Sequence, residues 1–136
     1  MIDFNAIKQI LAESRTIAVI GAKDKPSQPV DMVGRYLIEA GYNVIPVHPK
    51  RQNVWGLTTY PSITEVEEPV DIVDLFRASQ HCPDHAREVL TLKHPPRIFW
   101  MQTGISSPES EAILADTPTR VVSNECLMVV HRRLLT

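Results

Sequence analysis

Residues 16–30 read TIAVIGAKDKPSQPV and combine the features that decide the fold. A short apolar run leads directly into Gly21, and a helical pattern begins near Pro29. A dinucleotide-binding fingerprint would place glycines at the first, third and sixth positions after the strand. Here these positions hold Gly21, Lys23 and Pro26, so only the first glycine is present. The stretch predicts a strand, a tight turn and a helix whose start can bind an anion.

The same alternation of short apolar runs and helical segments continues along the chain. We expect strands at 16–20, 42–49, 70–76, 97–101 and 119–123, and helices at 1–15, 29–40, 83–92 and from 107 onward. Strands that alternate with helices pair in parallel, because each crossover returns over one face of the sheet. The prediction is an α/β fold: one domain, residues 1–136, with a three-layer, Rossmann-like, doubly wound parallel sheet of about five strands and the N-terminal helix packed on it. The tail, 126–135, fits a last helical turn or an added strand.

The composition is that of an ordinary globular protein. The chain has 136 residues, of which 43% are hydrophobic and 22% charged, and a net charge of −2. This charge gives no general attraction to nucleic acid or to a membrane surface. No apolar run approaches the roughly 18 residues of a membrane span. Two cysteines make no disulfide framework, so we expect a cytoplasmic protein. Because neither nucleic acid nor a membrane is favoured, we expect the ligand to be a small molecule.

Basic residues follow the first and second strands. Lys23, Lys25 and Ser27 can bind an anion beside the start of a helix. An NAD site needs an acid after the second strand to bind the ribose hydroxyls, whereas this chain has Lys50 and Arg51. Cations there favour a phosphorylated ribose, which both NADP and coenzyme A contain. Little chain follows the fifth strand to form a substrate region, which favours a binding module over a dehydrogenase.

Six ordered segments resemble the small stand-alone CoA-binding domain proteins and, more distantly, the CoA-binding domain of the succinyl-CoA synthetase alpha subunit. They are AVIGAKDKPSQP, GYNVIPVHPK, VWGLTTYPSITEV, VDIVDLFR, WMQTGI and NEC, which together span nearly the whole chain. The resemblance implies a Rossmann-like fold whose first loop surrounds CoA phosphates with Gly21, Ala22, Lys23, Lys25 and Ser27. It implies an adenosine site bordered by Val47, His48, Pro49 and Lys50. It also implies a path toward pantetheine lined by Phe76, Arg77, Gln102 and Gly104.

We therefore expect the protein to bind coenzyme A or an acyl-CoA through its βα phosphate loop, without catalysis of its own. The phosphorylated histidine of the synthetase lies in a further domain, so the resemblance implies no ligase activity. Two alternatives stay open: a small NADP-dependent reductase, and a CoA-sensing regulatory subunit of a larger enzyme. The sequence also leaves open a homodimer or a partner enzyme.

Cys126 follows the fifth strand, on the side of the sheet where ligands are expected. A helix that begins just after it would stabilise a thiolate, which could exchange with CoA disulfide to store CoA as a mixed disulfide. The alternative is a buried cysteine that acts as a small hydrophobic residue. His81, Cys82 and His85 lie close together in the sequence, but no fourth ligand accompanies them, so we expect no metal site.

Three further residues have predicted roles within the fold. We expect Asp74 to accept hydrogen bonds from neighbouring backbone N–H groups. Gly34 lacks a side chain and is expected to let the second helix pack closely on the sheet. Arg77 follows the third strand, where it fits either a pair with a phosphate or a cap on the edge of the sheet.

Overall fold

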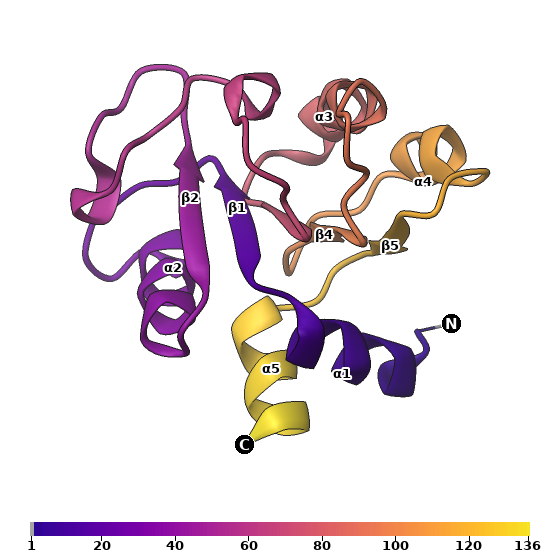
Figure 1. Ribbon diagram of the computed structural model, residues 1–136, viewed down its shortest axis with the longest axis horizontal. Coiled ribbons are helices and arrows are strands. Elements are labelled where there is room, and N and C mark those ends of the chain that lie inside the picture. The colour runs from indigo at the N-terminus through magenta and orange to yellow at the C-terminus, as the bar shows by residue number, and fades with distance from the viewer. Residues whose placement is uncertain (1) are drawn as a thin grey trace.

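Five parallel strands form one sheet at the centre of the structure, in the order β2-β1-β3-β4-β5 (Figure 1). The computed structural model describes residues 2–136, so Met1, the first residue of the expected domain, lies outside the described residues. The strands are β1 (Thr16–Ile20), β2 (Asn43–Val47), β3 (Ile72–Leu75), β4 (Ile98–Met101) and β5 (Arg120–Val122). The predicted single α/β domain with a Rossmann-like parallel sheet is confirmed.

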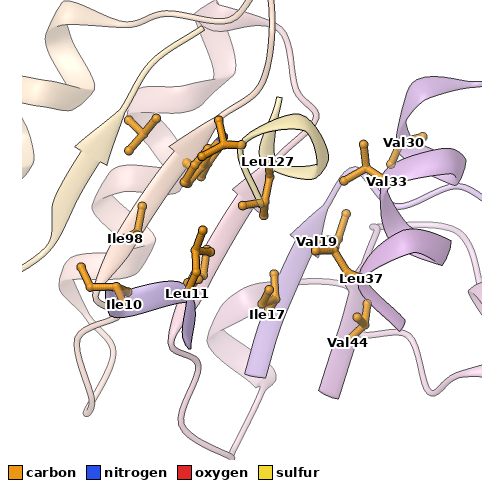
Figure 2. Close-up of a cluster of buried hydrophobic side chains, with 14 of the residues drawn as sticks. Ile10, Leu11, Ile17, Val19, Val30, Val33, Leu37, Val44, Ile98 and Leu127 are labelled. Carbon is orange, nitrogen blue, oxygen red and sulfur yellow. The ribbon is translucent and has the colours of Figure 1, made fainter. Parts of the chain in front are cut away.

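Helices cover both faces of the sheet and complete the three layers. They are α1 (Phe4–Glu13), α2 (Pro29–Glu39), α3 (Cys82–Leu90), α4 (Pro108–Leu114) and α5 (Leu127–Leu135). One core cluster joins α1, α2 and α5 to the sheet, and the other lies under α3 and α4. Figure 2 shows the first of these clusters, with Leu11, Leu37 and Leu127 near Ile17 of β1. The tail is a helix, which decides between the two expectations for it.

The helix ends follow from the residues that the sequence places there. Asp3 caps α1, where its carboxylate accepts a hydrogen bond from the Ala6 N–H at 3.1 Å. Ser107 caps α4, where its hydroxyl accepts from the Ser110 N–H at 3.1 Å. Gly41 follows α2 with a φ of +98°, a left-handed conformation that ends a helix without strain for glycine. Local capping chemistry thus decides where the sheet-covering segments begin and end.

The connection from β2 to β3 differs from the others because it contains no α-helix. Two short 3-10 helices, η1 (Val54–Gly56) and η2 (Ile63–Glu65), lie within it. β2 is an edge strand, so Pro46 within it leaves no neighbouring strand without a hydrogen-bond donor. No helix within residues 2–136 is long and apolar enough to cross a lipid bilayer.

Gly34 contacts a tryptophan rather than the sheet. A Cβ atom at Gly34 would lie 2.2 Å from Cη2 and Cζ2 of Trp55. The prediction that Gly34 lets α2 pack closely on the sheet is therefore wrong. The missing side chain instead makes room for an indole ring that comes from the β2–β3 connection.

The side chain of Asp74, in the central strand β3, has no hydrogen-bond partner in the part of the chain that the structure describes. Both of its carboxylate oxygens are buried and unpaired within residues 2–136, so the prediction that they bond to backbone N–H groups is wrong. The strand N–H groups are directed within the plane of the sheet, whereas side chains stand perpendicular to it. Asp74 therefore extends into an apolar layer, and burial raises the pKa of its carboxyl group well above the ordinary value.

Candidate ligand-binding site

A cavity of about 490 Å³ opens at the carboxyl ends of the strands, where the strand order reverses between β1 and β3. Ligands of doubly wound sheets bind at such a reversal, because the loops diverge there and leave a crevice. The walls are mainly apolar, with Val30, Phe76 and Ile105 among them. The polar side chains on the walls come from different loops and include Lys23, Arg77 and Gln102.

Gly21 brings the loop after β1 into close contact with the end of β3. It has a φ of +87°, and a Cβ atom there would lie 2.4 Å from the Phe76 carbonyl oxygen. The N–H groups of Gly21 and Ala22 both donate to the Val47 carbonyl, at 2.9 and 3.2 Å. These two groups therefore join β1 to β2. Ala22 and Val47 have buried side chains that belong to the hydrophobic core.

The N–H groups that can bind an anion come later in the same loop. Within residues 2–136, no partner is found for the N–H groups of Lys23, Asp24, Lys25 and Ser27. Ser27 is exposed and has a φ of +74°, a left-handed conformation that is rare for residues other than glycine. α2 begins two residues later, so its first turn adds the positive end of a helix dipole.

His48 lies at the centre of a group of basic side chains after β2. Its Nδ1 accepts hydrogen bonds from the N–H groups of Lys50 and Arg51, both at 3.1 Å, so the imidazole proton is on Nε2. Partial burial and nearby positive charges hold the pKa of His48 below its ordinary value. In order of effect, these charges belong to Arg51, Lys23, Arg77 and Lys50. Cations from three strand ends thus meet around one neutral histidine.

The loops after β1 and β2 also contact each other directly. Arg51 Nη1 lies 4.0 Å from Asp24 Oδ1, a partly exposed ion pair between the two loops. Pro49 and Lys50 are exposed and lie outside the cavity lining, as does Lys25. The predicted residues therefore divide into a cavity group and a basic group at its edge.

Arg77 lines the cavity, and part of its guanidinium group lacks a partner. The Nε atom is buried, and no acceptor for it is found in the part of the chain that the structure describes. A buried donor without an acceptor costs about 1–3 kcal/mol. Since Nε is shielded from the cavity, it does not decide between the predicted pairing with a phosphate and a cap on the sheet edge, and both expectations for Arg77 stay open.

Gln102 and Cys126 form the wall of the cavity beside α5. Gln102 Oε1 accepts a hydrogen bond from the Leu127 N–H, the first of α5, at 3.0 Å. Since that partner is a donor, the amide orientation is fixed, and Nε2 is the remaining donor of the group. Cys126 is half-buried at the N-cap of α5 and lines the cavity. Gly104 lies outside the lining, where its N–H donates to Asn124 Oδ1 at 2.7 Å.

The sequence did not indicate the small and apolar part of the cavity wall. Pro29, Val30, Ala78, Thr103 and Ile105 line it but were not predicted. Their residue types are equally common in a core or a turn. The one signal for a place in the cavity wall was their position after strands β3 and β4 or at the start of α2. Within residues 2–136, no group of His, Cys, Asp and Glu side chains is arranged to hold a metal ion.

Known proteins resemble this chain over nearly its full length. The uncharacterized protein YneT of Bacillus subtilis strain 168 is 36% identical over 125 residues, covering 92% of this chain and 91% of that protein. A Thermus thermophilus structure, described as cell-free ID.343, is 41% identical with a TM-score of 0.91, covering 98% and 100% of the two chains. A hypothetical protein from Pyrococcus horikoshii OT3 is 30% identical with a TM-score of 0.93, covering 99% and 94%.

A family model described as a CoA binding domain matches residues 15–132, from the start of β1 into α5. The matched range contains every strand of the sheet and every residue named above as part of the candidate site. The chain therefore belongs to the CoA binding domain family, and this membership supports CoA-related binding in general.

Proposed function

We propose that the protein binds coenzyme A or an acyl-CoA at the carboxyl edge of its sheet and catalyses no reaction of its own. The observation that carries this proposal is the gathering of four cations around His48, next to a cavity with mainly apolar walls. Coenzyme A combines the same two properties, because a triply phosphorylated adenosine portion continues into an uncharged pantetheine arm. The two halves of the site match the two halves of the ligand.

Each part of the ligand then has its own partners. The pyrophosphate binds the N–H groups of Lys23, Asp24, Lys25 and Ser27 and the start of α2, with help from the Lys23 side chain. The phosphate on the ribose binds Lys50 and Arg51, and Val47, His48 and Pro49 border the adenosine. The pantetheine arm occupies the cavity between Phe76 and Gln102, where Gln102 Nε2 can donate to an amide carbonyl. The Arg77 side chain lines the same cavity, and its positive charge attracts the phosphates of the ligand.

A small NADP-dependent reductase is the competing enzyme, and a CoA-sensing subunit of a larger enzyme is the competing interaction role. Thermal unfolding with CoA, acetyl-CoA, NADPH and NAD separates the reductase from the binding protein. CoA should raise the melting temperature in proportion to the logarithm of its concentration above the dissociation constant. A rise with NADPH and none with CoA would overturn the proposal in favour of the reductase.

A matched pair of lysine variants tests whether the binding is at the proposed site. Lys23→Met removes a cation that lines the cavity, whereas Lys8→Met makes the same change on the exposed surface of α1. Calorimetry should show weaker CoA binding for Lys23→Met and unchanged binding for Lys8→Met. Equal affinities in both variants would place the ligand elsewhere. Mass spectrometry of ligand copurified from cells would identify the acyl group.

Cys126 lines the cavity, and we propose that it also stores CoA as a mixed disulfide. Its thiolate attacks one sulfur of CoA disulfide, that S–S bond breaks, one CoA thiolate leaves, and a Cys126–CoA disulfide forms. Cys82 is the internal control, because it is fully buried and burial raises the pKa of its thiol to about 11. Intact-mass and peptide measurements should find one added CoA, at Cys126 alone. An unmodified Cys126 would refute the exchange.

A further inference from the structure

The two ends of the loop that follows β2 are joined by backbone hydrogen bonds. Residues 48–59 leave the end of β2, and the loop closes where the His48 N–H donates to the Tyr60 carbonyl at 2.9 Å. The Tyr60 N–H in turn donates to the Pro46 carbonyl at 3.0 Å. This loop contains Lys50 and Arg51, two of the four cations around His48, and both lie outside the cavity lining. Its closed base fixes where the loop begins and ends but not where its tip lies.

Trp55 fixes the tip of the loop on helix α2, which the loop passes in Figure 1. Its indole Nε1 donates to Asp31 Oδ1 at 2.9 Å, and its ring lies in the space left by the missing side chain of Gly34. Asp31 is buried and also pairs with Arg35 Nε, at 3.0 and 3.1 Å to its two oxygens. We call this contact of Trp55 with Asp31 and Gly34 the Trp55 latch.

The backbone at the tip of the loop is left-handed at three residues, of which only Trp55 is strained by it. Asn53, Trp55 and Gly56 have φ values of +52°, +54° and +74°. A left-handed conformation is unusual for a bulky residue such as tryptophan, so contacts elsewhere must impose it. Val54 lies buried between Asn53 and Trp55, and its N–H donates to Thr59 Oγ1 at 3.0 Å. Strain of this kind persists only where surrounding contacts impose it, and it is found most often at functional sites.

We propose that Trp55 is a positioning residue, which through the Trp55 latch holds Lys50 and Arg51 at the edge of the anion site and makes the protein selective for a phosphorylated ribose. This inference rests on the proposed function. The latch fixes the tip of the loop, so fewer residues move freely between fixed points. Lys50 and Arg51 therefore lose less conformational freedom when they bind a ligand. A ligand without the ribose phosphate does not reach these two cations, so it gains nothing from their positions.

The ratio of two dissociation constants tests this role. Dephospho-CoA lacks only the ribose phosphate, and wild-type protein should bind CoA more tightly than dephospho-CoA by about tenfold or more, as expected for a charge-assisted contact. Trp55→Phe keeps an aromatic ring beside Gly34 but lacks the N–H donor. Calorimetry should show that this variant loses most of the preference, while its affinity for dephospho-CoA stays the same.

Three further variants separate the latch from a general loss of stability. Asp31→Ala removes the acceptor and should lower the ratio, whereas Asp31→Asn keeps an oxygen for Trp55 and should preserve it. Gly34→Ala should lower the ratio because its methyl group displaces the indole. Tyr36→Phe, also on α2, removes the hydrogen bond to His131 instead and should leave the ratio unchanged. A wild-type ratio in Trp55→Phe and Gly34→Ala, or an equal loss of affinity for both ligands, would overturn the proposal.

Hydrogen exchange without ligand distinguishes failure of the latch from failure of the proposed function. The amides of residues 48–59 should exchange at least about tenfold faster in Trp55→Phe than in wild type, because the tip then opens locally. Unchanged exchange would refute the latch even if CoA binds. Faster exchange in a protein that binds neither ligand would establish the latch, and would refute the proposed function together with the selectivity that depends on it.

Discussion

At the amino end of the sheet, a hollow of about 590 Å³ lies between the last turns of α1, α2 and α5. Two of its hydroxyl groups have partners within the fold: the Tyr36 hydroxyl lies 2.7 Å from His131 Nδ1, and the Tyr42 hydroxyl donates to the Leu11 carbonyl at 2.7 Å. The cavity at the carboxyl end is smaller, but Arg77 Nε there has no partner within residues 2–136. Volume alone therefore does not distinguish the two hollows. The cations that gather at the carboxyl end do.

Two aspartates near β3 show a second contrast, between the start of a strand and its interior. Asp71, just before the strand, accepts hydrogen bonds from the N–H groups of Arg15 and Thr16 at 2.8 and 2.9 Å. Asp74, inside the strand, accepts none in the described part of the chain. N–H groups at the start of a strand are free to bond to side chains, whereas those within the sheet bond to neighbouring strands. The same residue type is thus stabilising in one position and costly in the other.

The largest expected effect comes from Asp74→Asn. Because the folded pKa of Asp74 is raised, its contribution to stability is complete below the unfolded pKa of about 3.9 and is lost as pH rises toward the folded pKa. In that window, wild type should lose about 1.4 kcal/mol of unfolding free energy per pH unit relative to Asp74→Asn. Urea unfolding between pH 4 and pH 8 measures this difference.

The exposed Asp116 offers a matched control for this experiment. Asp116→Asn makes the same chemical change where water already solvates the carboxylate, so its pH dependence should match that of wild type. If Asp74→Asn also paralleled wild type, Asp74 would be ionised in the folded protein. The contrast between an aspartate at the start of β3 and one in its interior would then no longer hold.

The next effect concerns ligand affinity at the carboxyl end. Arg77→Met should weaken CoA binding by about 1.5–3 kcal/mol, or roughly 10- to 150-fold, because a charged donor at the cavity wall is lost. Arg97→Met is the control near the amino end, where Arg97 pairs with Glu13 at 2.8 Å on the surface. Calorimetry should find its CoA affinity unchanged. Equal affinity for Arg77→Met and wild type would remove Arg77 from the site.

Much of this arrangement could be predicted because predicted strands and helices alternate along the chain. Short apolar runs separated by helices imply parallel strands, and parallel strands bring the residues after them to one edge. Lys23, Arg77 and Gln102 were found on this reasoning, together with the family resemblance, and all three line the cavity. Helix starts capped by Asp3 and Ser107 follow from the sequence as well, because a capping side chain acts locally.

Other features depend on contacts between distant segments, which a single sequence does not show. The position of Trp55 on Gly34 depends on the path of a long connection without an α-helix. Alternation along β3 indicates which face Asp74 points to, but it does not reveal whether a partner waits there. Ile105 could not be told from a core residue, because apolar walls of a cavity and of a core use the same side chains.

A smaller effect is expected from Tyr42→Phe at the amino end. The substitution removes the hydroxyl that donates to the Leu11 carbonyl, which lies in the last turns of α1. Loss of one such hydrogen bond should lower the free energy of unfolding by about 0.5–1.5 kcal/mol. CoA affinity should stay the same, because the hollow at this end binds no ligand in our proposal. A parallel loss of affinity would show that the two ends are coupled.

The smallest effect comes from the two histidines whose pKa values are lowered, mainly by burial: His131 at the amino end and His48 at the carboxyl end. For a lowered folded pKa, the stabilisation is complete above the unfolded pKa of about 6.5 and is lost as pH falls toward the folded value. This sign is opposite to that of Asp74, so the measurement needs the Asp74→Asn background. There, urea unfolding should show less stability at pH 5 than at pH 7.

Ligand then separates the contributions of the two histidines in that background. Phosphates bound beside His48 offset the cations around it and raise the pKa of its imidazole. Saturating CoA should therefore remove the part of the stability loss between pH 7 and pH 5 that is due to His48. His131 lies at the other end of the sheet, so its part should persist with CoA and disappear in His131→Asn, whose amide can still bond to Tyr36. If CoA left the acid loss unchanged in the His131→Asn protein, the bound phosphates would lie away from His48.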